Sequence, residues 1–188
     1  MKMLIRSFFV ITFLALMAPP ISHAEDVAEL VGEGPEGYKQ SNYRTPVPAT
    51  LKGARVVDAK SAHELWQEGS TVFVDVLPRP PQPKNIKDPT KWKVPKRFSI
   101  KGSTWLPNVG FGRLHPKIDA YYRNGLERLT KGDKTKSLVI FCQAQCWMSW
   151  NAAKRALSYG YTTVAWFPGG SNDWDAAGYP LEEKLPAK

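Results

Sequence analysis

Short apolar runs alternate with segments of helical periodicity along most of the chain. Runs rich in β-branched residues predict strands within residues 54–58, 71–77, 98–106, 138–141 and 163–167. A short helix is expected with Ser61 as N-cap and Glu64 closing a capping box, and apolar residues at helical spacing predict helices over 118–129 and 147–157. Because strands alternate with helices, the pattern predicts a single α/β domain with a central, mainly parallel sheet flanked by helices.

The strand within 71–77 is expected to be buried in the sheet and to finish at Asp75. Ligand sites of open parallel sheets lie outside the carboxyl ends of the strands, so we expect the chemistry at that edge. Two interpretations of Asp75 stay open. Its carboxylate orients a neighbouring loop by hydrogen bonding, or it is a plain strand-terminating residue.

Residues 1–24 have the pattern of a secretory signal peptide. Lys2 and Arg6 precede an apolar stretch over residues 8–17, and small residues occur at 22–24. The stretch is shorter than the roughly 20 residues that span a bilayer, so we expect removal rather than anchoring. The mature protein is then periplasmic or secreted, with no stable membrane insertion; an uncleaved N-terminal anchor is the alternative.

Other segments lie outside the alternating pattern. Residues 25–53 predict an irregular arm before the domain at 54–182, and residues 183–188 a C-terminal tail. Residues 78–97 are a Pro- and Lys-rich insertion, and its length is typical of a lid, a docking surface or a solvated loop. The net charge is +9, and positive residues cluster partly within 84–101. Such a surface favours acidic proteins or small anions as partners, and a solvated basic loop with no partner is the alternative. We find no nucleic-acid motif.

Both cysteines of the chain lie between the strand at 138–141 and the helix at 147–157. Cys142 ends the strand, so its thiol faces the free N–H groups and positive dipole end of the next helix, which stabilise a thiolate or a bound oxyanion. If the protein is exported, its two cysteines lie in an oxidising compartment, where disulfides persist. The alternatives are that Cys142 is a buried packing residue or that the pair is a small structural disulfide.

Four short signatures occur in order, at residues 72–76, 100–107, 139–142 and 160–180. Together they resemble the ordered signatures of a rhodanese-like domain, and the resemblance covers roughly residues 54–182. More narrowly, Cys146-Trp-Met-Ser-Trp and the arm sequence Tyr43-Arg-Thr-Pro-Val-Pro resemble exported rhodanese-like proteins named for a CxxCW motif and associated with pyrroloquinoline quinone (PQQ)-dependent catabolism. Three residues separate the cysteines here, so that motif fits loosely.

In rhodaneses the cysteine at the strand end carries a persulfide, and the resemblance assigns that role to Cys142. The active-site loop would also contain Gln143, Ala144, Gln145, Trp147, Met148 and Ser149. Ser149 would donate a hydrogen bond within the loop or cap its helix. Met148 replaces the family's basic loop residue and Leu77 replaces a frequent arginine, which disfavours phosphatase activity and turnover of a dianion such as thiosulfate.

Cys146 follows Cys142 by four residues. If the helix begins before Cys146, the two Cα atoms lie about 6 Å apart, inside the window for a disulfide. Cys146 could then resolve a sulfenate or persulfide on Cys142. The hypothesis is a catalytic pair in a sulfurtransferase or thiol–disulfide oxidoreductase. The resemblance implies a role accessory to PQQ-dependent alcohol oxidation, with an exported PQQ-dependent dehydrogenase or cytochrome c as partner.

Two hypotheses from other classes stay open. Cys142, Cys146 and Met148 offer soft ligands suited to copper, which predicts a copper carrier. If the protein binds no copper, no cofactor is expected. His63 and His115 lack recognisable ligand spacing. The other hypothesis is a non-catalytic docking module that binds an exported dehydrogenase or cytochrome through its basic insertion.

Overall fold

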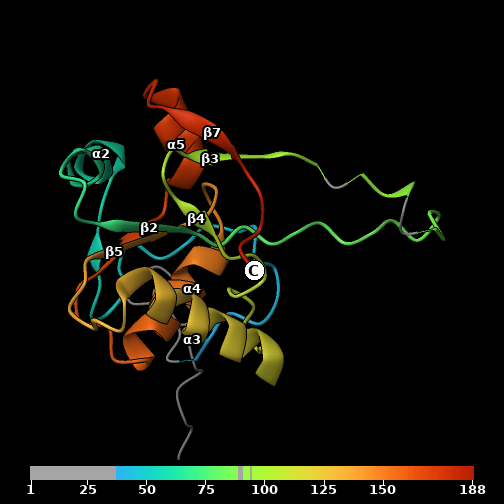
Figure 1. Cartoon of the computed structure of the whole chain (residues 1–188), viewed down its shortest axis with the longest axis horizontal. Coiled ribbons are helices and arrows are strands. Elements are labelled where there is room, and N and C mark those ends of the chain that lie inside the picture. The colour runs from blue at the N-terminus through green and yellow to red at the C-terminus, as the bar shows by residue number, and fades with distance from the viewer. Residues whose placement is uncertain (1–36, 89–90, 94) are drawn as a thin grey trace, which may run out of the picture.

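Figure 1 shows the protein as a computed structural model, which describes residues 37–88, 91–93 and 95–188. The predicted signal peptide at 1–24 and the arm up to residue 36 lie outside the described residues. Among the helices of the described part, none has the length and apolar character needed to cross a membrane.

Five strands form the central sheet, in the order β1-β6-β5-β2-β4 with every pairing parallel. The strands are β1 (Arg55–Val56), β2 (Val72–Asp75), β4 (Thr104–Trp105), β5 (Leu138–Phe141) and β6 (Val164–Phe167). All residues of β5 and β6, two of the three inner strands, are buried, as expected where helices cover both faces of a sheet. The predicted mainly parallel α/β fold is confirmed.

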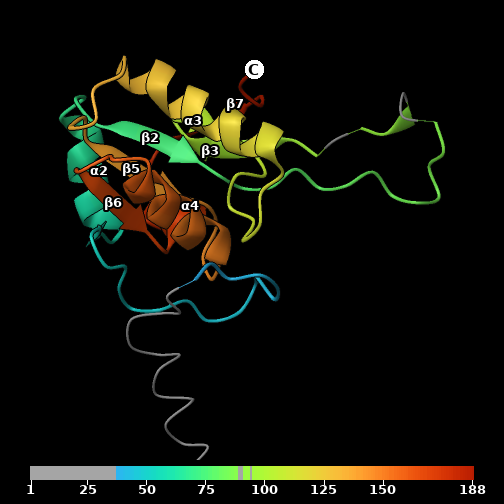
Figure 2. The same cartoon turned by 90° about the horizontal axis from the view of Figure 1, so that it is seen from below.

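Two pairs of helices cover the two faces of this sheet (Figures 1 and 2). On one face α3 (Pro116–Thr130) and α4 (Trp147–Ser158) lie side by side, and the Tyr122 hydroxyl joins them by donating to the Ala152 carbonyl at 3.1 Å. On the other face lie α2 (Ala59–Gln67) and α5 (Gly170–Ala176). Each face has its own apolar cluster, built around Trp150 on the α4 side and Trp174 on the α5 side.

Helix α2 begins earlier than the sequence pattern predicts. Its N-cap is Asp58, whose carboxylate accepts a hydrogen bond from the Ser61 N–H at 2.8 Å. Aspartate and serine are comparable N-caps, so the sequence alone does not choose between them. The prediction of Ser61 as N-cap was wrong by three residues.

A two-stranded antiparallel sheet lies at the edge of the fold, formed by β3 (Arg97–Ile100) and β7 (Leu181–Lys184). The single strand expected within 98–106 is therefore two strands, β3 and β4, in different sheets. Strand β7 crosses the boundary set at residue 182, and its charged sequence gave no strand signal. The chain then continues to the central sheet, where the Ala187 N–H donates to the Trp105 carbonyl at 2.9 Å.

The Pro- and Lys-rich segment between β2 and β3 extends away from the body of the protein (Figure 1, green). Its two ends are attached to the domain. The Arg79 N–H donates to Asn108 Oδ1 at 3.0 Å, and the Lys96 ammonium lies 2.7 Å from the Glu183 carboxylate. These two ends flank the cavity described below.

Candidate active site

The cysteine loop connects the end of β5 to the start of α4. Cys142 directly follows Phe141, the last residue of β5, and Cys146 is the N-cap residue of α4. Between them Gln145 has a φ of 52°, in the left-handed region, which turns the chain into the helix. The helix thus begins after Cys146 rather than before it, and the two cysteines lie on a tight loop instead of one helical turn.

The two sulfur atoms are in contact. The Cys142 thiol donates a hydrogen bond to the Cys146 sulfur, with the Sγ atoms 2.7 Å apart, and both cysteines are free. A disulfide bond is about 2.05 Å long, so a small displacement would bring the pair to bonding distance. The loop therefore holds two free thiols in direct contact.

The two thiols differ in access to solvent. Both cysteines are buried, but Cys146 lines a cavity of about 590 Å³, and Cys142 is absent from the described residues around that cavity. Gln143 and Met148 of the same loop also line the cavity. A molecule in this cavity would lie against Cys146 rather than Cys142.

The electrostatic surroundings of the two thiols also differ. Burial raises the pKa of Cys142, and the hydrogen bond to Cys146 and the nearby Asp75 carboxylate raise it further. The hydrogen bond from Cys142 lowers the pKa of Cys146, and the Met148 N–H and the Arg44 guanidinium lower it too. Negative charge on the pair is thus favoured at Cys146, at the positive end of α4.

Arg44 was not singled out in the sequence. It belongs to the arm, which bonds to the start of α4 through the Trp147 N–H donating to the Tyr43 carbonyl at 3.0 Å. The Trp147 indole also donates to the Pro46 carbonyl at 3.0 Å. These contacts bring a cation to Cys146 from about 100 residues earlier in the chain, a placement without a local sequence signal.

Asp75 lies at the end of β2, fully buried, next to β5. Its carboxylate accepts hydrogen bonds at 2.6 Å from the Arg97 guanidinium and from the Ser99 hydroxyl. The Arg97 guanidinium in turn donates to the Ser171 hydroxyl at 3.1 Å, and the Ser171 N–H donates to the Cys142 carbonyl at 3.0 Å. Asp75 is thus linked to the cysteine loop indirectly, through Arg97, which the sequence interpretation also missed.

The remaining loop residues hold the loop in place. The Ser149 hydroxyl donates to the Cys146 carbonyl and accepts from the Trp166 indole, both at 3.0 Å. The Ala144 N–H donates to Asn172 Oδ1 at 3.0 Å. Gly170 has a φ of 54°, and a Cβ there would lie 2.4 Å from the Cys142 carbonyl oxygen. The first residue of α5 must therefore be glycine for the loop to pack against it.

Of the three proposed copper ligands, Cys142 and Cys146 are in contact, and Met148 lines the same cavity as Cys146. Within the described part of the chain, no group of three or more histidine, cysteine, aspartate or glutamate side chains could hold a metal ion. His63 stacks on Tyr179 with ring centroids 3.8 Å apart, and His115 is the N-cap of α3. Both histidines have these structural contacts.

Comparison with known proteins returns solved structures alone. No protein-family model and no curated protein matches the chain. The rhodanese-like domain of the Alr3790 protein from Anabaena sp. aligns at 19% identity and a TM-score of 0.43, covering 70% of this chain and 84% of that domain. The polysulfide-sulfur transferase homodimer from Wolinella succinogenes aligns at 21% identity and a TM-score of 0.42, covering 70% and 80%.

Proposed function

We propose that this protein cleaves a sulfur–sulfur bond of its substrate by thiol–disulfide exchange, with Cys146 as the attacking sulfur and Cys142 as the resolving one. The observation that carries the proposal is the 2.7 Å contact between two thiols of which Cys146 alone, among the described residues, lines the cavity. This order reverses the one expected from the sequence, in which the cysteine at the strand end was the nucleophile.

The exchange takes place in two steps. The Cys146 thiolate attacks one sulfur of a substrate R–S–S–R′, so that the S–S bond breaks, RS⁻ leaves and takes a proton from solvent, and a mixed disulfide forms on Cys146. Cys142 then attacks the Cys146 sulfur, its proton passes to the departing R′S⁻, and a Cys142–Cys146 disulfide forms. The substrate gains two electrons and the protein loses two. A dithiol reductant restores the pair.

The surroundings of the pair support this order. The Cys142 hydrogen bond, the Met148 N–H and the Arg44 charge all stabilise the attacking thiolate. The buried Cys142 keeps its proton until a mixed disulfide forms next to it, because its pKa is raised by burial.

Sulfur transfer through a persulfide on Cys146 is the second candidate. It would use the same cavity and the same attacking thiolate, with the terminal sulfur of a polysulfide as the target. The adjacent Cys142 disfavours a long-lived persulfide, because a thiol 2.7 Å away can displace the outer sulfur as sulfide.

The test traps the covalent intermediate. The protein is mixed with hydroxyethyl disulfide, a small neutral substrate, quenched with acid and measured by intact mass. Cys142→Ala is expected to accumulate a mixed disulfide on Cys146, and Cys146→Ala is expected to form none. A mixed disulfide on Cys142 in the Cys146→Ala variant would contradict the order, and no adduct or disulfide in any form would overturn the function.

The location and partner are also proposals, supported by the sequence resemblance. We propose that the protein works in the periplasm beside an exported PQQ-dependent dehydrogenase or cytochrome c. Cell fractionation and cross-linking in the native host test this, with recovery in the cytoplasm as the contrary result.

A further inference from the structure

Two cavities meet at the foot of the Pro- and Lys-rich segment. The cavity at Cys146 has a volume of about 590 Å³, and a second one of about 620 Å³ extends toward the start of α3. The two share four lining residues, Arg79, Pro80, Pro81 and Phe111. They form one groove that runs from Cys146 to His115, and we call it the cysteine groove.

Positive side chains line the cysteine groove along its length. Arg44 lies at the Cys146 end, Arg79 in the middle and Arg113 at the far end. Among the described residues that line either cavity there is no aspartate or glutamate, and these three arginines form none of the salt bridges found in the described part of the chain. The groove thus has a net positive field with no internal counter-charge.

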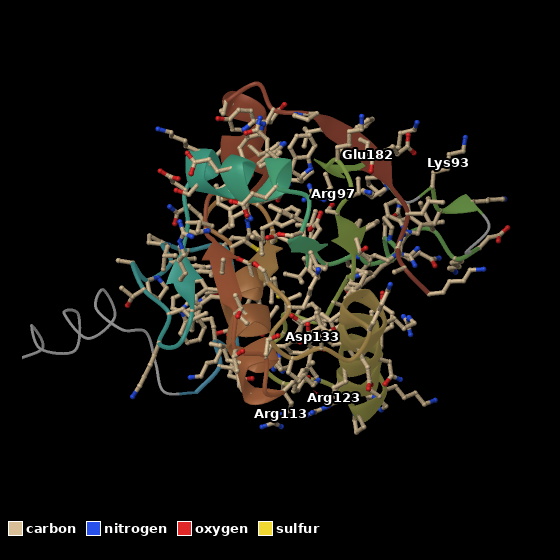
Figure 3. All side chains as sticks on the ribbon, turned by 60° about the vertical axis from the view of Figure 1, so that its left-hand side comes forward. Lys93, Arg97, Arg113, Arg123, Asp133 and Glu182 are labelled. Carbon is tan, nitrogen blue, oxygen red and sulfur yellow. The ribbon has the colours of Figure 1, made fainter. Side chains whose placement is uncertain are left out.

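Two other cations that line the groove, Lys96 and Arg97, are already paired. Arg97 binds the buried Asp75 carboxylate, and Lys96 pairs with Glu183. Figure 3 shows that Arg97 lies within the body of the protein, whereas Arg113 lies at its margin. The available charge of the cysteine groove therefore comes from the three arginines.

The floor of the groove is held rigidly by α4. The buried Arg155 guanidinium donates to the carbonyls of Val109, Phe111 and Gly112, at 2.9, 3.1 and 2.9 Å. Phe111 lines both cavities, and its ring makes a T-shaped contact with the Tyr43 ring, with centroids 5.6 Å apart. The remaining walls are largely prolines and other apolar side chains, so the groove is preformed and partly apolar.

We propose that the substrate of the cysteine groove is an acidic peptide segment that carries a disulfide. This inference rests on the proposed function of Cys146. Each cavity falls in the size range that takes drug-sized ligands, which is larger than a free sulfur oxyanion requires. An extended chain with carboxylates spaced along it would match the three arginines, and its sulfur would reach Cys146.

The test compares peptides of equal length that carry the same mixed disulfide within an acidic, a neutral or a basic sequence. The acidic peptide is expected to have the highest kcat/KM, and its advantage is expected to shrink as the ionic strength rises from 0.01 to 0.15 M, where the Debye length falls from about 30 to about 8 Å. Arg113→Ala should raise the KM for the acidic peptide about five-fold, the size of one exposed charge contact. Lys60→Ala, an exposed lysine on α2 away from the groove, is the matched control.

Hydroxyethyl disulfide separates the two proposals. If it reacts at Cys146 but the three peptides have equal kcat/KM, the groove proposal is overturned and the proposed function stands. Preference for the basic peptide, or a higher kcat/KM with thiosulfate than with the acidic peptide, would also overturn it. If no substrate reacts, hydroxyethyl disulfide included, the proposed function itself is overturned.

Discussion

At the scale of single residues, the two cysteines have opposite environments although they lie four positions apart. Cys142 closes a buried strand and loses hydration, while Cys146 stands at a helix N-terminus beside an arginine. The order of attack we propose follows from that asymmetry. It is testable through the reactivity of each thiol.

Alkylation should report the difference in pKa. Cys146 is expected to react with iodoacetamide first, and to keep reacting at pH values below the range near 8.5 where an ordinary thiol becomes thiolate. As the pH falls through its lowered pKa, Cys146 takes up a proton and the rate falls. In Cys142→Ala the hydrogen bond is lost, so the pKa of Cys146 rises and the rate profile shifts to higher pH. Peptide mapping assigns the site, and faster labelling of Cys142 would contradict the prediction.

A second prediction at this scale concerns the buried ion pair. Asp75→Asn would leave the Arg97 guanidinium buried without its charge partner, since both side chains are almost fully buried. We expect the free energy of unfolding to fall by about 3–5 kcal/mol, measured by urea denaturation. Glu183→Gln, which breaks the exposed pair with Lys96, is the matched control and should cost at most about 1 kcal/mol. Equal losses in the two variants would argue against a stabilising role for the buried pair.

At the scale of elements, the first turn of α4 and the segment at 109–112 approach closely. A Cβ on Gly110 would lie 2.3 Å from the Met148 carbonyl oxygen, and the Asn151 amide donates to the Gly110 carbonyl at 2.8 Å. The same segment supplies the floor of the cysteine groove through Phe111. Its position therefore depends on backbone contact with the helix that begins at the active site.

Gly110→Ala should disturb this contact. The added methyl group meets backbone atoms, which cannot rotate away. We therefore expect the free energy of unfolding to fall by about 1–3 kcal/mol. Gly37→Ala is the control, since among the described residues no atom would lie within 4 Å of a Cβ there. Thermal unfolding of the two variants gives the comparison. A Gly110→Ala protein as stable as Gly37→Ala would contradict the close approach.

At the scale of the whole molecule, the C-terminal residues attach to parts of the fold distant in sequence. The Ala187 N–H donates to the Trp105 carbonyl at 2.9 Å, and the Tyr121 hydroxyl donates to the Ala187 carbonyl at 2.8 Å. The Arg128 guanidinium donates to the Lys188 carbonyl at 2.6 Å. The last residues therefore join β4 to α3.

Removal of residues 185–188 should weaken the whole domain. Three hydrogen bonds are lost, and at about 1 kcal/mol each the expected fall in the free energy of unfolding, measured by urea denaturation, is about 3 kcal/mol. Removal of Lys188 alone is the control, because it leaves both Ala187 bonds in place. A four-residue truncation with unchanged stability would show that these contacts contribute nothing.

The sequence by itself determined the α/β class, because apolar runs and helical repeats are local patterns that can be recognised without knowledge of the fold. It also located the cysteine loop between β5 and α4, since a strand end followed by a helix start is a local signal. It did not predict β7, whose Leu-Glu-Glu-Lys sequence forms a strand through pairing with β3. Tertiary structure alone decided which thiol faces the cavity and which cations surround it. Arg44 and Arg97 reach the cysteine loop through long-range contacts, and burial and charge at a site depend on everything packed around it.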